Sequence, residues 1–133
     1  MLMKNGKIIF VAAASLALLL AGCGPEHTAK HTAKQFLKDN LADNAMSAIE
    51  YGSLDSTSFV SDVAIATMRE RTAASHAFKD DIEYGEREPG DKLYFISVRY
   101  NNALGDDTKH TVYMDKTLET VVCVKDNSAS IEK

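Results

Sequence analysis

The stretch KLYFISVRY, residues 92–100, decides the fold of this chain. Successive side chains of a β-strand point to opposite faces, so these residues divide into two sets. One set comprises Tyr94, Ile96, Val98 and Tyr100, and the other begins with Leu93 and Phe95. Both sets contain apolar residues, and a strand with apolar residues on both faces lies inside a sheet or lines a cavity. We therefore predict a central strand here.

Shorter strands are expected around the central one. Residues 82–88, 109–113 and 119–125 are further strand candidates, because their apolar residues alternate or run together. Pro89 and Gly90 stand where a type II turn requires them. Residues 101–107 are expected as a loop carrying Gly105, and residues 115–117 as a turn. Residues 48–52 predict a further short strand, with a continued helix as the alternative.

Two helices are expected before most of these strands. Pro25 suits the start of a helix over residues 26–41, in which Ala29, Ala33, Phe36, Leu37 and Leu41 recur at helical spacing. After a polar turn at residues 54–58, a second amphipathic pattern predicts a helix over residues 59–76. The order favours an α+β fold, with two N-terminal helices packed on one face of a 4–5-stranded antiparallel sheet.

The N-terminus has the layout of a secretory signal peptide. Lys4 and Lys7 precede an uncharged, mostly apolar run over residues 8–20, and Ala21 and Gly22 follow it. This run is shorter than the roughly 20 residues that a membrane-spanning helix needs. A spanning helix over residues 8–24 remains the alternative.

The residues Leu20, Ala21, Gly22 and Cys23 resemble the lipobox of bacterial lipoproteins. The resemblance implies cleavage before Cys23, a diacylglyceryl group on its sulfur and acylation of its amine. Several acyl chains on one residue would anchor the protein durably, whereas one chain holds only reversibly. Gly24 in place of aspartate favours the periplasmic face of the outer membrane, provided that the host is Gram-negative.

The expected domain boundaries follow from this anchor. We expect residues 1–22 as a removed signal, 23–28 as a lipidated tether, 29–126 as a single domain and 127–133 as a flexible tail. The signal carries two of the 15 basic residues and none of the 19 acidic ones, so the mature part has a net charge of −6. This balance argues against a nucleic-acid partner. With Cys23 lipidated, Cys123 has no disulfide partner, and its apolar neighbours predict a small buried hydrophobe.

The element order resembles that of NTF2-like and cystatin-like α+β domains of small envelope lipoproteins. The segments LKDNL (residues 37–41), AIEYGSLDS (residues 48–56) and YNNALG (residues 100–105) also resemble a group of uncharacterised bacterial envelope proteins. This chain departs from their pattern with Asn44 in place of proline and Asn101 in place of a basic residue. The resemblance implies a fold more than an activity.

The candidates for chemistry are few. His27 and His31 share a helix face but lack the third ligand that a metal site needs, and Lys30, Lys34 and Lys38 form a row that is expected to face solvent or lipid headgroups. Acidic residues cluster around residues 80–91 as a solvated edge, and Ser75-His76 lacks a nucleophile elbow. NTF2-like domains often enclose a pocket on one sheet face, which makes Tyr94 and Tyr100 the candidate pocket residues; core packing is the alternative.

The sequence contains no catalytic, metal-binding or cofactor-binding motif. We therefore expect a monomeric, membrane-tethered, non-catalytic domain that binds an envelope protein or a small ligand. Two alternatives stay open. One is a small NTF2-like enzyme that uses a carboxylate and tyrosines in a pocket, and the other is an inhibitor of a secreted hydrolase that presents the loop of residues 101–107.

Overall fold

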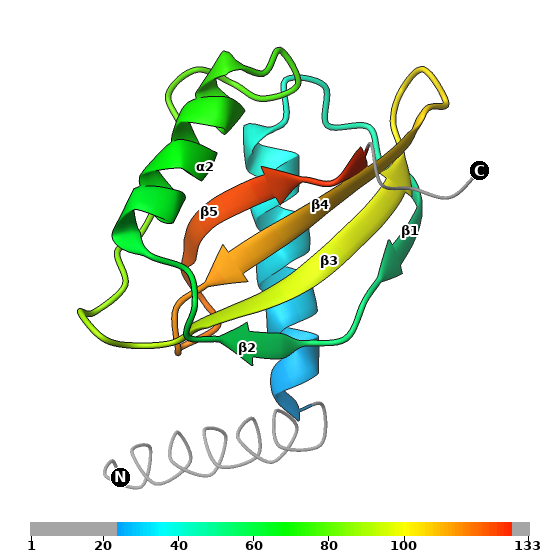
Figure 1. Cartoon of the computed structure of the whole chain (residues 1–133). Helices are drawn as coiled ribbons and strands as arrows, with labels where there is room; N and C mark the ends of the chain where they lie inside the picture. The colour runs from blue at the N-terminus through cyan, green and yellow to red at the C-terminus, as the bar shows by residue number, and fades with distance from the viewer. Residues whose placement is uncertain (1–23, 129–133) are drawn as a thin grey trace, which may run out of the picture.

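A computed structural model describes residues 24–128 of the chain. The expected signal peptide, the lipobox residues Leu20, Ala21, Gly22 and Cys23, and the last five residues lie outside the described part. The α+β class is confirmed: within these residues, two helices accompany a five-stranded antiparallel sheet (Figure 1). In chain order, the elements are α1 (residues 24–40), β1 (Ser47–Tyr51), β2 (Asp55–Thr57), α2 (Asp62–Ala74), β3 (Leu93–Asn101), β4 (Asp107–Met114) and β5 (Val121–Asp126).

The central position predicted for residues 92–100 is confirmed. One side of β3 pairs with β4 along its length, and the other side is shared by β1 and β2. The two short strands meet different halves of β3, with Gly52 between them donating its amide to the Ser97 carbonyl at 2.9 Å. The strand expected at residues 48–52 is therefore confirmed as β1. The segment expected as a polar turn contains β2, because the first half of β3 offers a free edge with which it pairs.

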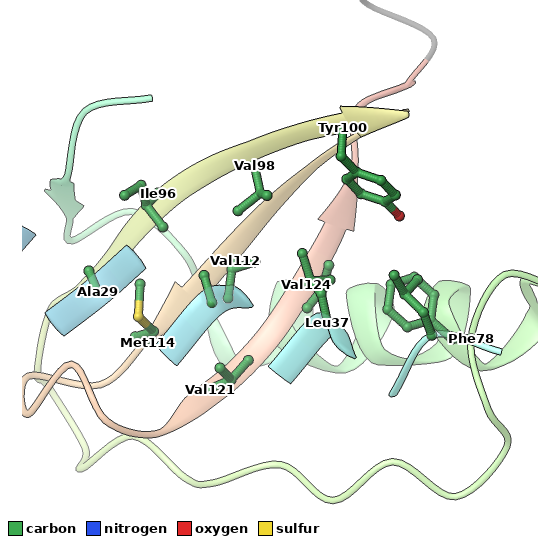
Figure 2. Packing of buried hydrophobic residues seen from close by; sticks show 12 residues of the cluster. Ala29, Leu37, Phe78, Ile96, Val98, Tyr100, Val112, Met114, Val121 and Val124 are labelled. Carbon is green, nitrogen blue, oxygen red and sulfur yellow. The ribbon is translucent and has the colours of Figure 1, made fainter. Parts of the chain in front are cut away.

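The helix α1 packs on one face of the sheet. Ala29, Ala33 and Leu37 recur every four residues, and each is 0% exposed. Small alanines allow the helix to approach the strands closely, so its stripe meets the inward side chains of β3, β4 and β5 (Figure 2). These side chains include Ile96, Val98, Val112, Met114, Val121 and Val124. The interior between α1 and the sheet is therefore filled.

The expectation of two N-terminal helices on one face is wrong. The strands β1 and β2 separate the helices in sequence, and α2 packs along β5 (Figure 1). Ile65 of α2 joins a second cluster with Leu93, Val122 and Cys123. Leu93 faces away from Ile96 because strand side chains alternate, so this cluster lies on the face opposite α1. The thiol of Cys123 is buried as expected, and burial raises its pKa to about 12.

The strand expected over residues 82–88 is also wrong, because this segment is a loop. The outer edge of β5 is occupied by α2 side chains, with Arg69 Nε donating to the Val122 carbonyl at 2.9 Å and Thr72 Oγ1 to the Val124 carbonyl at 3.3 Å. Only Gly85 of the loop reaches the same edge, through its amide and the Val121 carbonyl at 2.9 Å. These contacts cover an edge that would otherwise invite strand pairing.

The helix α1 reaches into the segment that was expected as a tether. The residues 24–28, expected as a tether, form the first turn of α1. The type II turn is confirmed by the positive φ of Gly90 (84°) and by the bond from the Asp91 amide to the Glu88 carbonyl. No helix within residues 24–128 is long and apolar enough to span a membrane. All five strands and both core clusters lie within these residues, so the domain carries its own core and can be studied as residues 24–133.

Candidate functional site

A groove runs between α2 and the sheet, on the face opposite α1. We call it the helix–sheet groove, and its volume is about 540 Å³. This volume falls within the range of small-molecule binding sites, roughly 300–1,000 Å³. The lining residues are Phe59, Val60, Ala64, Thr67, Met68, Arg71, Thr72, Ser75, Phe78, Tyr113, Val124, Lys125 and Asp126.

The helical repeat places one stripe of α2 along the groove. Residues three and four apart lie on one side of a helix, and the groove residues Ala64, Thr67, Met68 and Arg71 follow this spacing. Ser61 caps the helix, because its Oγ accepts the Ala64 amide hydrogen at 3.1 Å. The helix therefore begins later than residue 59, the start that the sequence pattern predicts.

The late start leaves an apolar segment outside the helix at one end of the groove. Arg87 holds this segment, donating to the Val60 carbonyl and to Asp62 Oδ1, each at 2.7 Å. Phe59 is 95% exposed and Val63, nearby on α2, is 75% exposed. Two large apolar side chains thus meet solvent beside a groove whose neighbouring wall is apolar.

The opposite end of the groove is polar. The bonds from Arg69 to Val122 and from Thr72 to Val124 show that α2 and β5 run in the same direction. Arg71 and Ser75, at the end of α2, therefore lie toward Lys125 and Asp126 at the end of β5. The groove is amphipathic along its length.

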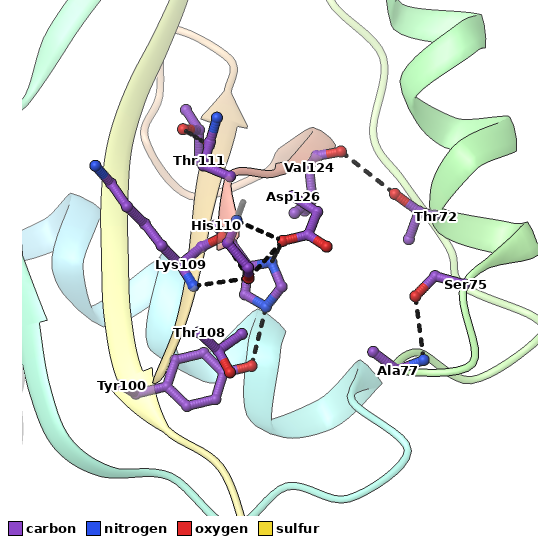
Figure 3. Close-up of polar contacts among 12 residues, drawn as sticks. Thr72, Ser75, Ala77, Tyr100, Thr108, Lys109, His110, Thr111, Val124 and Asp126 are labelled. Atoms are coloured by element: carbon purple, nitrogen blue, oxygen red, sulfur yellow. Dashed lines mark hydrogen bonds and ion pairs between the residues drawn. The ribbon is translucent and has the colours of Figure 1, made fainter. Parts of the chain in front are cut away.

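A buried network lies behind this polar end (Figure 3). The hydroxyl of Tyr100 and Nε2 of His110 are 2.9 Å apart, and His110 Nδ1 lies 3.9 Å from Asp126 Oδ1. Burial lowers the pKa of His110 to about 4, against the opposing effect of Asp126, and burial raises the pKa of Tyr100 to about 12. Both side chains are therefore neutral at pH 7.

Phe78 seals this network from the groove side. Its ring meets His110 edge-on, with the ring centroids 5.3 Å apart. The bond from the Ala42 amide to the Ala77 carbonyl, at 2.8 Å, holds its segment against the end of α1. The His110 side chain is 1% exposed and Nδ1 has no hydrogen-bond partner. His110 is 1% exposed and Tyr100 3% exposed, so both side chains pack in the interior, and His110 also lies close to Asp126.

The sequence-predicted pocket residues lie on the α1 face, away from the helix–sheet groove. Tyr100 is 3% exposed and borders a small hollow of about 170 Å³ together with Leu41 and His76. Tyr94 is half-buried near the other end of β3, opposite Met114 of β4. The filled core separates the two tyrosines, so the described structure does not bring them into a common cavity.

The other sequence candidates are placed as follows. His27 and His31 are exposed on α1, and within residues 24–128 no three residues of metal-binding type gather. Ser75 Oγ accepts the Ala77 amide hydrogen, which assigns it a capping role. The acids near the loop serve ion pairs, with Glu86 on Arg69 at 3.3 Å and Asp91 on Lys116 at 3.4 Å.

Sequence reasoning missed the groove itself. Its walls come from α2 and from β4 and β5, which are about 50 residues apart in the chain. No local signal predicts it, because Arg71 and Lys125 lie in separate segments that meet only in the fold. No family model, no curated protein and no solved structure matches this chain.

Proposed function

We propose that this protein is a lipid-anchored component of the bacterial cell envelope whose domain is a non-catalytic binding module. The helix–sheet groove is its binding site. The observation that carries the proposal is the groove of about 540 Å³ with Phe59 exposed at its apolar end. Exposed apolar surface beside a concave site is typical of ligand or partner binding.

The anchor proposal rests on the lipobox, since the structure describes no residue before Gly24. Because Gly24 is the first residue of α1, lipidation of Cys23 would hold the N-terminal end of this helix at the membrane surface. In a Gram-negative host, the absence of aspartate after the cysteine favours the periplasmic face of the outer membrane. The partner would then be an envelope protein or a small ligand of that compartment.

An enzyme of the NTF2-like kind draws less support. Such an enzyme needs an open pocket with a reactive group inside it, and the α1 face of the sheet is filled by side chains. The helix–sheet groove does contain a carboxylate, Asp126, but Oδ1 of this group accepts from the Ser128 amide at 2.9 Å and from the Ser128 hydroxyl at 2.7 Å. These bonds give Asp126 a structural role at the end of β5.

A second candidate function is inhibition of a hydrolase through the loop between β3 and β4. Asn102 Oδ1 accepts the amide hydrogens of Leu104 at 3.0 Å and of Asp106 at 2.9 Å, which fixes the loop. Leu104 is 86% exposed at its tip. A pre-organised loop that presents one large apolar side chain suits the cleft of a partner protein.

The lipid anchor leads to a direct prediction. In a bacterium that processes lipoproteins, Cys23→Ala should abolish incorporation of radiolabelled palmitate, because the thiol and the freed amine of Cys23 are the acylated groups. Cys123→Ala is the matched control, since it removes the other cysteine and should leave the label in place. Unchanged labelling of Cys23→Ala would refute the anchor.

The binding site leads to a second prediction. Residues 24–133 should bind the neutral apolar dye Nile red with one-to-one stoichiometry, and Phe59→Ser should weaken this binding about tenfold, because an apolar contact of phenylalanine size is lost. The measurement is a fluorescence titration of each variant.

Leu104→Ser is the matched control for Phe59→Ser. It also removes a large exposed apolar side chain, one that does not line the groove, and should leave the dye affinity unchanged. Equal losses in the two variants would mean that the dye binds exposed apolar residues in general. That result, or no binding at all, would overturn the groove as the binding site.

A further inference from the structure

We propose that the helix–sheet groove takes a single-chain amphiphile with an anionic head group, and specifically the carboxylate of a free fatty acid. The inference rests on the proposed function, because it names the ligand class of the same site. It follows from three features of the groove: two cations without an ion-pair partner among residues 24–128 at one end, an apolar wall at the other end, and lining residues that follow successive turns of α2.

The first feature is that two cations at the polar end lack an ion-pair partner in the described part of the chain. Three of the four arginines, at positions 69, 87 and 99, each pair with a carboxylate. Arg71 and Lys125, both at the polar end of the groove, have no such partner within residues 24–128. Both side chains are exposed, so the ion pair that each lacks can be supplied by a ligand. Guanidinium groups pair with carboxylates through two parallel hydrogen bonds, which favours this head group.

The acidic residue at the same end does not cancel the two cations. Asp126 contributes one negative charge against two positive ones, and Ser128 occupies Oδ1 of its carboxylate with two hydrogen bonds. Figure 3 shows Asp126 and Val124 on the β5 side, with Thr72 and Ser75 across from them at the end of α2. The polar end therefore carries a net positive charge and selects an anion over a cation.

The second and third features concern the tail. From the polar end, the groove continues past Tyr113 and Met68 to Val60 and Phe59. The lining residues of α2 run from Ala64 to Thr72, which gives this part of the wall a length of about 12 Å at 1.5 Å per residue, and Val60 and Phe59 extend it. A linear alkyl chain fits such a long apolar wall better than a compact ring does. Each methylene group that is buried should therefore strengthen binding by a similar factor.

The test is competition against Nile red on residues 24–133, with amphiphiles kept below the concentrations at which they form micelles. Dodecanoate should displace the dye, and dodecanol and dodecyltrimethylammonium, which have the same chain length, should be at least tenfold weaker. Decanoate should also be about tenfold weaker than dodecanoate, because two methylene groups are lost.

Variants locate the head group. Arg71→Gln combined with Lys125→Gln should weaken dodecanoate about tenfold and leave dodecanol unchanged. Lys38→Gln, which removes an exposed cation from α1, is the control and should change neither affinity. In a spectrum of methyl-labelled methionine, dodecanoate should shift the signal of Met68 and leave that of Met114, in the α1-side core, in place.

The outcomes separate this inference from the proposed function. If Nile red binds in the groove but dodecanoate and dodecanol compete equally, or the double variant keeps its dodecanoate affinity, then the anionic amphiphile is wrong and the binding module stands. If dodecanoate shifts Met114 and not Met68, the site is wrong. If Nile red itself does not bind, the proposed function fails together with this inference.

Discussion

Acidification from pH 6.5 to about pH 4 is expected to lower the free energy of unfolding of the domain by about 3 kcal/mol through His110. The imidazole is buried between Phe78 and Tyr100, and among residues 24–128 the charged group closest to it is Asp126, at 3.9 Å from Nδ1. Desolvation outweighs the attraction of this carboxylate and lowers the pKa of His110 from 6.5 to about 4.

The direction of the effect follows from proton binding. Between pH 6.5 and pH 4, His110 binds a proton in the unfolded chain but not in the folded domain. The unfolded state is then favoured by each step of acidification, so stability falls as the pH falls through this window. Above pH 6.5 the residue is neutral in both states and contributes no pH dependence. At about 1.4 kcal/mol per pKa unit, the full loss is about 3 kcal/mol.

Urea unfolding of residues 24–133 at a series of pH values measures this effect. His110→Gln should remove the contribution of His110 to the slope between pH 6.5 and pH 4, whatever its stability at pH 7. Asp126→Asn should extend the window to lower pH, because the carboxylate that supports the imidazolium is gone. A wild-type slope that persists in His110→Gln would show that other groups cause the acid sensitivity.

The central part of the fold could be predicted from sequence because its pattern has a local cause. The alternation in residues 92–100 reflects a strand that is covered on both faces, and the stripe of Ala29, Ala33 and Leu37 reflects a helix on one of these faces. The same reasoning fails for residues 82–88. Ile82 and Tyr84 alternate with exposed residues because the loop passes along the covered edge of β5, and burial of alternate residues needs no strand there.

The position of α2 depends on tertiary contacts, so no single stretch of the sequence reveals it. Four consecutive residues of β5 are buried, Val121 and Val124 on the α1 side and Val122 and Cys123 on the α2 side. Such a continuous apolar run is typical of a strand with both faces covered, and it could have indicated helices on opposite faces. The groove residues could not be predicted from sequence, because Arg71 and Lys125 line one groove only when α2 packs on that face of the sheet.

The edge of β5 depends on one side chain of α2. Arg69 donates from Nε to the Val122 carbonyl and from a terminal nitrogen to the Gly85 carbonyl, each at 2.9 Å. It also pairs with Glu86 at 3.3 Å, and its guanidinium carbon lies 4.8 Å from the centre of the Tyr84 ring. One cation thus joins the helix, the strand edge and the loop of residues 82–88.

Arg69→Met is therefore expected to lower the free energy of unfolding by about 3 kcal/mol, because hydrogen bonds from charged donors are worth about 1.5–3 kcal/mol each and water replaces them only in part. The methionine keeps the aliphatic stem, so the loss reports the polar contacts and not a cavity. Arg71→Met, two residues away on the same helix, is the matched control and should change stability by less than about 0.5 kcal/mol, since its side chain lies at the groove without an ion pair in the described structure. Urea unfolding at pH 7 measures both variants.

Uncovering the strand edge should also make Arg69→Met more prone to form oligomers, which light scattering detects. Equal stability of the two variants would mean that packing of Ile65, and not the arginine, holds α2 against β5.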